Sequence, residues 1–174
     1  MGVDFFWRRV PGAVAAEPSA KRLRGMVPHW FDDEFGVLRK AGLVMAVENN
    51  GSLMDFVLTA GGSIADESAR LPVFGGELRT EEEDTEYGLV AEFEVCVLEP
   101  RQVRRAAAFL RDVPVHDLVK ASDPLLAAQA AALGFSTPWS TEWSASLVAD
   151  LLELQGFFSA AADAGEAILK VQSA

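Results

Sequence analysis

Apolar residues recur along the chain with two different periods, and each period predicts a different element. Residues 3–10 are rich in β-branched and aromatic side chains and stop at Pro11-Gly12, which predicts an inner strand. Residues 89–98 alternate between apolar and polar side chains, which predicts a strand with one buried face. Residues 71–78 predict a short extended piece that the Gly75-Gly76 pair breaks.

Helical spacing of apolar residues is more common in this chain than alternation. It predicts helices over 17–26, 31–41, 52–60, 100–112 and 122–134, and a last helix that begins between 137 and 144 and runs to about 170. Helices therefore outnumber strands and do not alternate strictly with them. This order predicts one α+β domain over 1–174, with a small mixed or antiparallel sheet packed against several helices and a long C-terminal helix.

Charge and composition narrow the classes of function. The chain has 174 residues and a formal net charge of −11, so it is expected to repel nucleic acid and anionic membranes unless its few basic residues are concentrated on one face. Its first residues lack a basic segment followed by an apolar one, and Gly134 and Pro138 interrupt its longest uncharged stretch. Neither a signal peptide nor a membrane span is expected. A single cysteine fits a reducing compartment, so a cytoplasmic location is expected.

Side chains that usually carry catalysis are scarce. The chain has two histidines, one cysteine and one tyrosine, whereas most enzymes that move protons or acyl groups recruit these residues. The Gly61-Gly62 and Gly75-Gly76 pairs match neither the P-loop nor the dinucleotide-binding pattern. The composition therefore favours binding over catalysis, with no cofactor expected.

Two residues with metal-binding or nucleophilic chemistry have simpler structural interpretations. On a helix, His29 would share a face with Asp32 and Asp33, but no second histidine is near and the usual zinc spacings are absent. Cys96 lies in the middle of a predicted strand between two valines, which is typical of a buried, inert thiol. We therefore expect no metal site and no cysteine nucleophile.

An acidic run is the first candidate for contact with a partner. It comprises Glu81, Glu82, Glu83 and Asp84, and it lacks the ligand spacing and central glycine of a calcium loop. One interpretation is a solvated loop. The other is a contact surface for a basic protein.

Two tryptophans that flank a carboxylate are the second candidate. Trp139, Glu142 and Trp143 lie between two predicted helices, and aromatic side chains beside a carboxylate are typical of a ligand-binding rim. The alternative is that Trp143 belongs to the core and Trp139 packs over the start of the last helix.

Several stretches are familiar in combination, and they are Met1-Gly2-Val3, residues 53–61, residues 71–76, Tyr87-Gly88, residues 99–103 and residues 151–169. In that order and over nearly the whole chain, they resemble the YfbM-like family, a bacterial domain of unknown function. The resemblance implies an α+β fold and no known reaction. Asp55 and Tyr87 lie within these stretches and are further ligand-binding candidates.

This chain departs from the family pattern at two places. The family's middle helix carries a tryptophan before its aspartate and a Leu-His pair after it, whereas this chain has Met54-Asp55-Phe56-Val57. The stretch before the last helix also differs, so a family site that used these residues is altered here. Two functions stay open: a non-catalytic binding or protein-interaction module, such as an immunity-type partner of a basic protein, and a small-molecule hydrolase or lyase that uses carboxylates near Trp139, Glu142 and Trp143.

Overall fold

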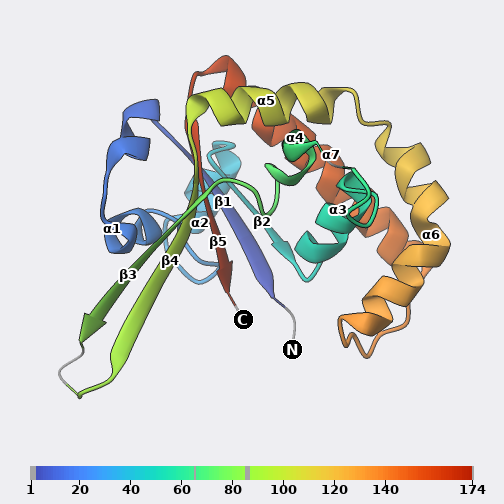
Figure 1. Ribbon diagram of the computed structural model, residues 1–174, viewed down its shortest axis with the longest axis horizontal. Helices are drawn as coiled ribbons and strands as arrows, with labels where there is room; N and C mark the ends of the chain where they lie inside the picture. The colour runs from blue at the N-terminus through green and yellow to red at the C-terminus, as the bar shows by residue number, and fades with distance from the viewer. Residues whose placement is uncertain (1–2, 65, 85–86, 174) are drawn as a thin grey trace.

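A five-stranded sheet in the order β2-β1-β5-β4-β3 forms the centre of the protein, and all its neighbouring strands are antiparallel (Figure 1). The computed structural model describes residues 3–64, 66–84 and 87–173. The strands are β1 (Asp4–Val10), β2 (Val44–Glu48), β3 (Glu77–Asp84), β4 (Val90–Leu98) and β5 (Ala167–Ser173). Strand β1 lies between β2 and β5, as the prediction of an inner strand required.

Helices cover both faces of the sheet. They are the 3-10 helix η1 (Gly12–Ala16) and the α-helices α1 (Ala20–Gly25), α2 (Phe35–Lys40), α3 (Gly51–Leu58), α4 (Glu67–Arg70), α5 (Pro100–Arg111), α6 (Val115–Ala132) and α7 (Thr141–Asp163). The sheet is antiparallel, and helices do not alternate one by one with strands, so the α+β prediction is confirmed. No helix within the described residues is long and apolar enough to cross a lipid bilayer.

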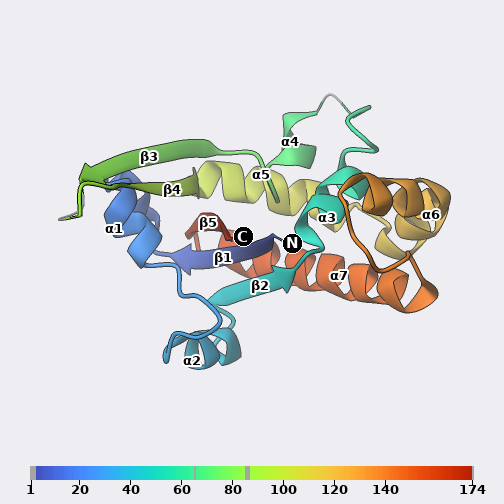
Figure 2. The ribbon, with the colours of Figure 1, turned by 90° about the horizontal axis from the view of Figure 1, so that it is seen from below.

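Each face of the sheet packs into a different hydrophobic cluster. Phe5 and Trp7 of β1 enter the larger cluster with side chains of α3, α5, α6 and α7, whereas Phe6 enters the smaller one with η1, α1 and α2. The alternation along β1 therefore sends successive aromatic side chains into different layers. Figure 2 shows α1 and α2 on one side of the molecule and the bundle of α3, α5, α6 and α7 on the other.

Helix α7 is a main packing element of the larger cluster. Leu147, Leu151, Leu154 and Phe158 are each fully buried, as the apolar stripe predicted. The helix ends at Asp163 and not near residue 170, because Gly165 adopts a φ of +67° that turns the chain.

Residues 167–173 form the central strand β5, so the assignment of residues 167–170 to the last helix was wrong. Ala167, Ile168, Leu169, Lys170 and Val171 are all buried in succession. A strand with neighbours on both edges and layers on both faces buries consecutive residues, whereas a surface helix buries only one stripe.

The acidic run is also a strand and not a loop. Residues 81–84 belong to β3, which pairs in antiparallel register with β4. Glutamate has a low intrinsic strand propensity, but pairing with a neighbouring strand overrides it. The prediction of a strand at β4 is confirmed, but its predicted face is fully buried only at Val95 and Val97, whereas Leu89 is exposed. Strands β3 and β4 together form a two-stranded ribbon that projects past the helices (Figure 1).

Candidate functional site

Trp139 and Trp143 lie together at the start of α7, as the sequence predicted, but Glu142 does not join them in a rim. The two indole rings are 5.3 Å apart, and both pack partly buried against the larger cluster. The Ser140 hydroxyl accepts a hydrogen bond from the Trp143 backbone N–H at 3.2 Å, which begins the helix. The Glu142 side chain is exposed in the first turn.

Each indole donates its N–H to a different element. Trp139 donates to Asp123 of α6 at 2.8 Å, and Trp143 donates to the side-chain oxygen of Asn50 at 2.6 Å. The amide of Asn50 in turn donates to Asp150 at 2.5 Å. Trp143, Asn50 and Asp150 therefore form a chain of hydrogen bonds that connects α7 with the segment before α3.

A cavity of about 470 Å³ lies beside this chain of hydrogen bonds. Trp143, Trp30 and Phe135 supply its aromatic lining. Burial raises the pKa of Asp150, and the hydrogen bond from Asn50 opposes that shift. Asp150 is thus a half-buried carboxylate with a raised pKa in the cavity that Trp143 lines. Sequence reasoning missed Asn50 and Asp150 because neither lies near the other in the chain.

Asp55 and Tyr87 are not brought together. Asp55, on α3, lines a second cavity of about 650 Å³ that Thr59 and Gln129 also line. Its Oδ1 atom is buried, and no described residue donates a hydrogen bond to it. Tyr87 lies just before β4 and is 81% exposed.

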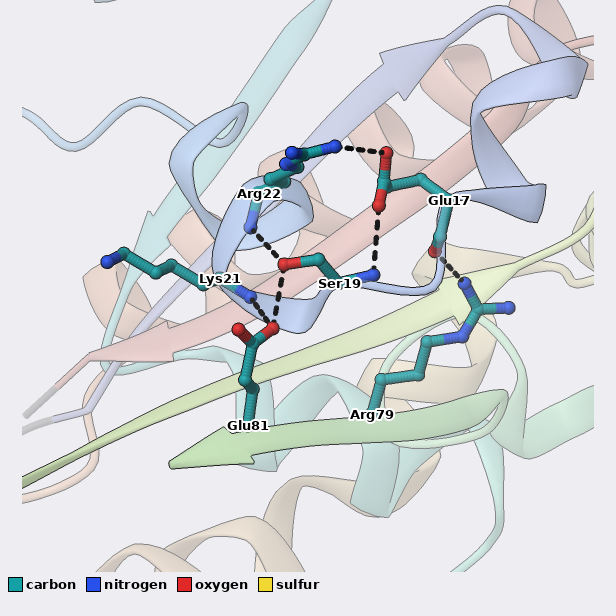
Figure 3. Close-up of polar contacts among 6 residues, drawn as sticks. All are labelled: Glu17, Ser19, Lys21, Arg22, Arg79 and Glu81. Carbon is teal, nitrogen blue, oxygen red and sulfur yellow. Dashed lines mark hydrogen bonds and ion pairs between the residues drawn. The ribbon is translucent and has the colours of Figure 1, made fainter. Parts of the chain in front are cut away.

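The ribbon of β3 and β4 divides its acidic residues between two faces. The face toward α1 carries the Glu81 and Glu83 side chains, whose charges are engaged within the protein. Glu81 accepts hydrogen bonds from the Ser19 hydroxyl at 2.7 Å and the Lys21 backbone N–H at 3.0 Å (Figure 3), and these bonds lower its pKa. Glu83 forms an ion pair with the Lys21 ammonium.

The side chain of Arg79 connects the same face of the ribbon to the segment before α1. Arg79 donates to the backbone carbonyl of Glu17 at 2.7 Å and forms an ion pair with Glu77 at 2.9 Å. Glu17 also pairs with Arg22 at 3.5 Å (Figure 3). Glu81 and Arg79 thus hold α1 against β3, which is a structural role that the acidic run did not reveal in the sequence.

The opposite face of the ribbon is open to solvent, and we call it the open face. Cross-strand partners share a face, and the register places Glu82 directly opposite Glu92. Asp84 and Glu94 lie on the same face, and these four exposed carboxylates make no hydrogen bond or ion pair with any described residue. The open face comprises Leu78, Thr80, Glu82, Asp84, Val90, Glu92 and Glu94.

His29 and Cys96 have structural contacts and are not placed together in a site. The imidazole of His29 packs on Phe6, with ring centroids 4.6 Å apart, and Asp32 accepts the backbone N–H of His29 at 2.6 Å. The Cys96 thiol donates to the Gly75 carbonyl at 3.3 Å, and burial raises its pKa. Among the described residues, no group of three or more His, Cys, Asp or Glu side chains is placed to hold a metal ion.

Lys170 is a buried charge that sequence reasoning assigned to a helix end. It lies on β5, opposite Trp7 on one side and Cys96 on the other, and only 5% of it is exposed. Its ammonium donates to the carbonyls of Leu71 at 2.7 Å and Val73 at 2.8 Å, and also to that of Gly75. Burial lowers the pKa of Lys170 to about 8.

Lys170 anchors residues 71–75 to the sheet, because its ammonium donates to three backbone carbonyls of that segment. Together with the indole N–H of Trp7, which donates to the Pro72 carbonyl at 2.8 Å, the ammonium fastens this irregular segment to the sheet. An irregular segment needs such donors because its buried carbonyls lack a ladder partner. One lysine within a run of buried apolar residues was the signal for this role in the sequence.

Comparison with known proteins gives one structural likeness. No protein-family model matches the chain, and no curated protein matches it. The fold is similar to the crystal structure of YfbM from Escherichia coli, a protein of unknown function, with a TM-score of 0.54 over 98% of this chain and 99% of that chain. At 14% identity, the likeness shows a shared fold and carries no function to this protein.

Proposed function

We propose that this protein is a non-catalytic interaction module and that the open face of the ribbon binds a basic surface of a partner protein. The observation that carries the proposal is the pair Glu82 and Glu92, which lie directly opposite one another and form no ion pair with a basic side chain of the described residues. Like charges directly opposite on neighbouring strands destabilise a sheet. A basic partner relieves this repulsion on binding.

The surroundings of the pair support the same surface. Leu78 and Val90 lie on the open face and are 62% and 60% exposed. Exposed apolar side chains among charges resemble a protein-binding surface more than a solvated one. Strand β3 also ends the sheet, and an edge strand has free backbone groups that a partner chain can use.

Net charge adds a kinetic argument. The formal charge of −11 favours encounter with a basic protein and disfavours nucleic acid. An immunity-type role, in which this module covers a basic protein, is the form of the proposal that uses both the charge and the exposed ribbon. In this form the partner is a basic protein and no cofactor takes part.

The test compares two variants with the same change in net charge. Glu82→Gln with Glu92→Gln removes the opposed pair, and Asp117→Asn with Asp163→Asn removes two exposed acids elsewhere. A partner captured from the native host is purified, and its association rate with each protein is measured at rising salt. The open-face variant is expected to associate at least about tenfold more slowly at low salt, whereas the control stays near wild type, because steering falls off over a Debye length of about 8 Å at physiological salt.

The free energy of unfolding provides a second test that does not depend on a partner. It is expected to be about 0.2–1 kcal/mol higher in the open-face variant than in the wild type, because the two opposed charges are removed. A partner whose association rate is indifferent to salt and equal for both variants would show that the open face contributes only solubility.

A further inference from the structure

Apolar side chains from three separate segments converge on the cavity of about 650 Å³ that Asp55 lines. Ile64, Phe74 and Leu133 are 37%, 42% and 41% exposed and all line it, together with Phe56 of α3. Isolated exposed apolar residues are ordinary, but their convergence on one concave site is typical of ligand pockets.

One buried polar atom in the lining of this cavity lacks a partner, whereas the Thr59 hydroxyl, which also lines it, is hydrogen-bonded to the backbone of Asp55 and Gly62. The buried Oδ1 of Asp55 accepts no hydrogen bond from any described residue, although buried carboxylate oxygens are normally satisfied. Burial is the main reason that the pKa of Asp55 is raised, and the charges of Arg70 and Lys170 oppose the shift. A hydrogen-bond donor on a ligand would supply what the fold does not.

Arg70 is the second unpaired group. It ends α4, it is exposed, and its guanidinium makes no hydrogen bond or ion pair with a described residue. The half-buried amide side chain of Gln129 also lacks a partner among the described residues. Arg70 is near enough to act on the Asp55 charge, yet the two form no ion pair. A guanidinium in this position can take a carboxylate through two parallel hydrogen bonds.

The loop that forms one wall of the cavity has strained backbone. Ala60 has a φ of +47°, and Gly61 and Gly62 follow with values of +65° and +86°. Left-handed backbone at a residue other than glycine is disfavoured and clusters at functional sites. A Cβ at Gly61 would lie 3.1 Å from the Phe56 ring, so glycine also lets this wall approach the aromatic side chain.

We propose that this cavity binds a small zwitterion, an α-amino acid with an apolar side chain. The ligand ammonium donates to Asp55, its carboxylate pairs with Arg70, and its side chain packs on Phe56 and Phe74. A single charged ligand would satisfy only one of the two unpaired groups, whereas a zwitterion satisfies both and leaves the apolar wall for its side chain. This binding is separate from the interaction proposed for the ribbon.

The test is calorimetric titration of the purified full chain with free amino acids and their blocked forms. Apolar amino acids are expected to bind saturably at concentrations up to ~10 mM. Acetylating the amine or amidating the carboxylate is expected to weaken binding at least about tenfold, the factor that corresponds to 1.4 kcal/mol. Absence of binding by every free amino acid at that concentration overturns the proposal.

Substitutions of two residues that line the cavity test whether the ligand binds there. Asp55→Asn and Arg70→Gln are each expected to weaken binding at least about tenfold, again the factor set by one lost charged contact. Arg111→Gln changes an exposed arginine of α5 outside the cavity and is expected to bind as wild type. Arg70 is exposed, so its variant tests the proposal independently of any change in stability at Asp55. Equal affinity of wild type and Arg70→Gln, or of the free and acetylated ligand, contradicts it.

Discussion

The ammonium of Lys170 is expected to make the stability of this protein rise with pH in the alkaline range. Burial lowers its pKa from 10.5 to about 8 in the folded protein, whereas the unfolded chain keeps the ordinary value. Between these values the unfolded state binds more protons than the folded state, so the free energy of unfolding increases with pH. The neutral amine keeps two N–H groups, so it can still serve two of its three carbonyl acceptors.

The magnitude follows from the size of the shift. One pKa unit corresponds to 1.36 kcal/mol, so the full gain between about pH 8 and pH 10.5 is about 3 kcal/mol. The reference protein is Lys170→Met, which keeps the apolar stem and removes the titrating group. Cys96 and Asp55, the other titratable groups that act on Lys170, are present in both proteins, so their contributions largely cancel in the difference.

Urea unfolding followed by tryptophan fluorescence measures this difference at pH 7, 8, 9 and 10 under reducing conditions. The wild type is expected to gain stability over Lys170→Met as pH rises above 8, whereas Lys40→Met, a change at an exposed lysine, leaves the wild-type slope unaltered. A difference that stays flat or falls with pH would refute the reasoning, because the carbonyls of Leu71, Val73 and Gly75 would then hold the proton more strongly than burial expels it.

Two further outcomes are expected from single changes. Leu151→Asp should abolish the folded state in far-UV circular dichroism, because a fully buried leucine is replaced by an unpaired charge at a cost above about 5 kcal/mol. The control variant Leu152→Asp changes a neighbouring residue that is 42% exposed and should have a melting temperature near that of the wild type. Equal melting temperatures of the two variants would mean that the buried face of α7 is misassigned. Asp55→Asn should raise the free energy of unfolding at pH 7 in denaturant titrations. The pKa of Asp55 is raised in the folded protein, so ionisation of Asp55 lowers stability at pH values above its ordinary pKa of 3.8. The gain in stability should disappear below pH 3.8, and a loss of stability at pH 7 would contradict the prediction.

The candidate sites were only partly visible in the sequence. Trp143 was marked by its neighbours Trp139 and Glu142, yet the cavity that it lines takes its buried polar groups from Asn50 and Asp150. Those residues meet only because α3 and α7 pack together, and no local spacing records that contact. Asp55 was named for its place within a resembling stretch, and its missing hydrogen-bond partner became evident only when burial was known.

Local pattern determined those parts of the protein where one face of an element is buried and the other is wet. Residues 89–98 and the apolar stripe of α7 each carry a period that matches their element. Residues 3–10, which are buried on both faces, were instead marked by their β-branched and aromatic composition, and the α+β class follows from the order of these elements. The net charge of −11 was likewise set by the sequence, whatever the fold.

Tertiary structure decided the elements whose pattern is ambiguous or unfavourable. From the sequence alone, the short and mostly apolar run at 167–171 fits a helix as well as a strand, and the pairing with β1 and β4 on its two edges decides for the central strand. Residues 81–84 oppose strand formation by composition, and only pairing with β4 and contact with α1 make them a strand. That same pairing divides their charges between an engaged face and an open one, because side chains on a strand alternate between faces and neighbours far away in the chain determine which face is covered.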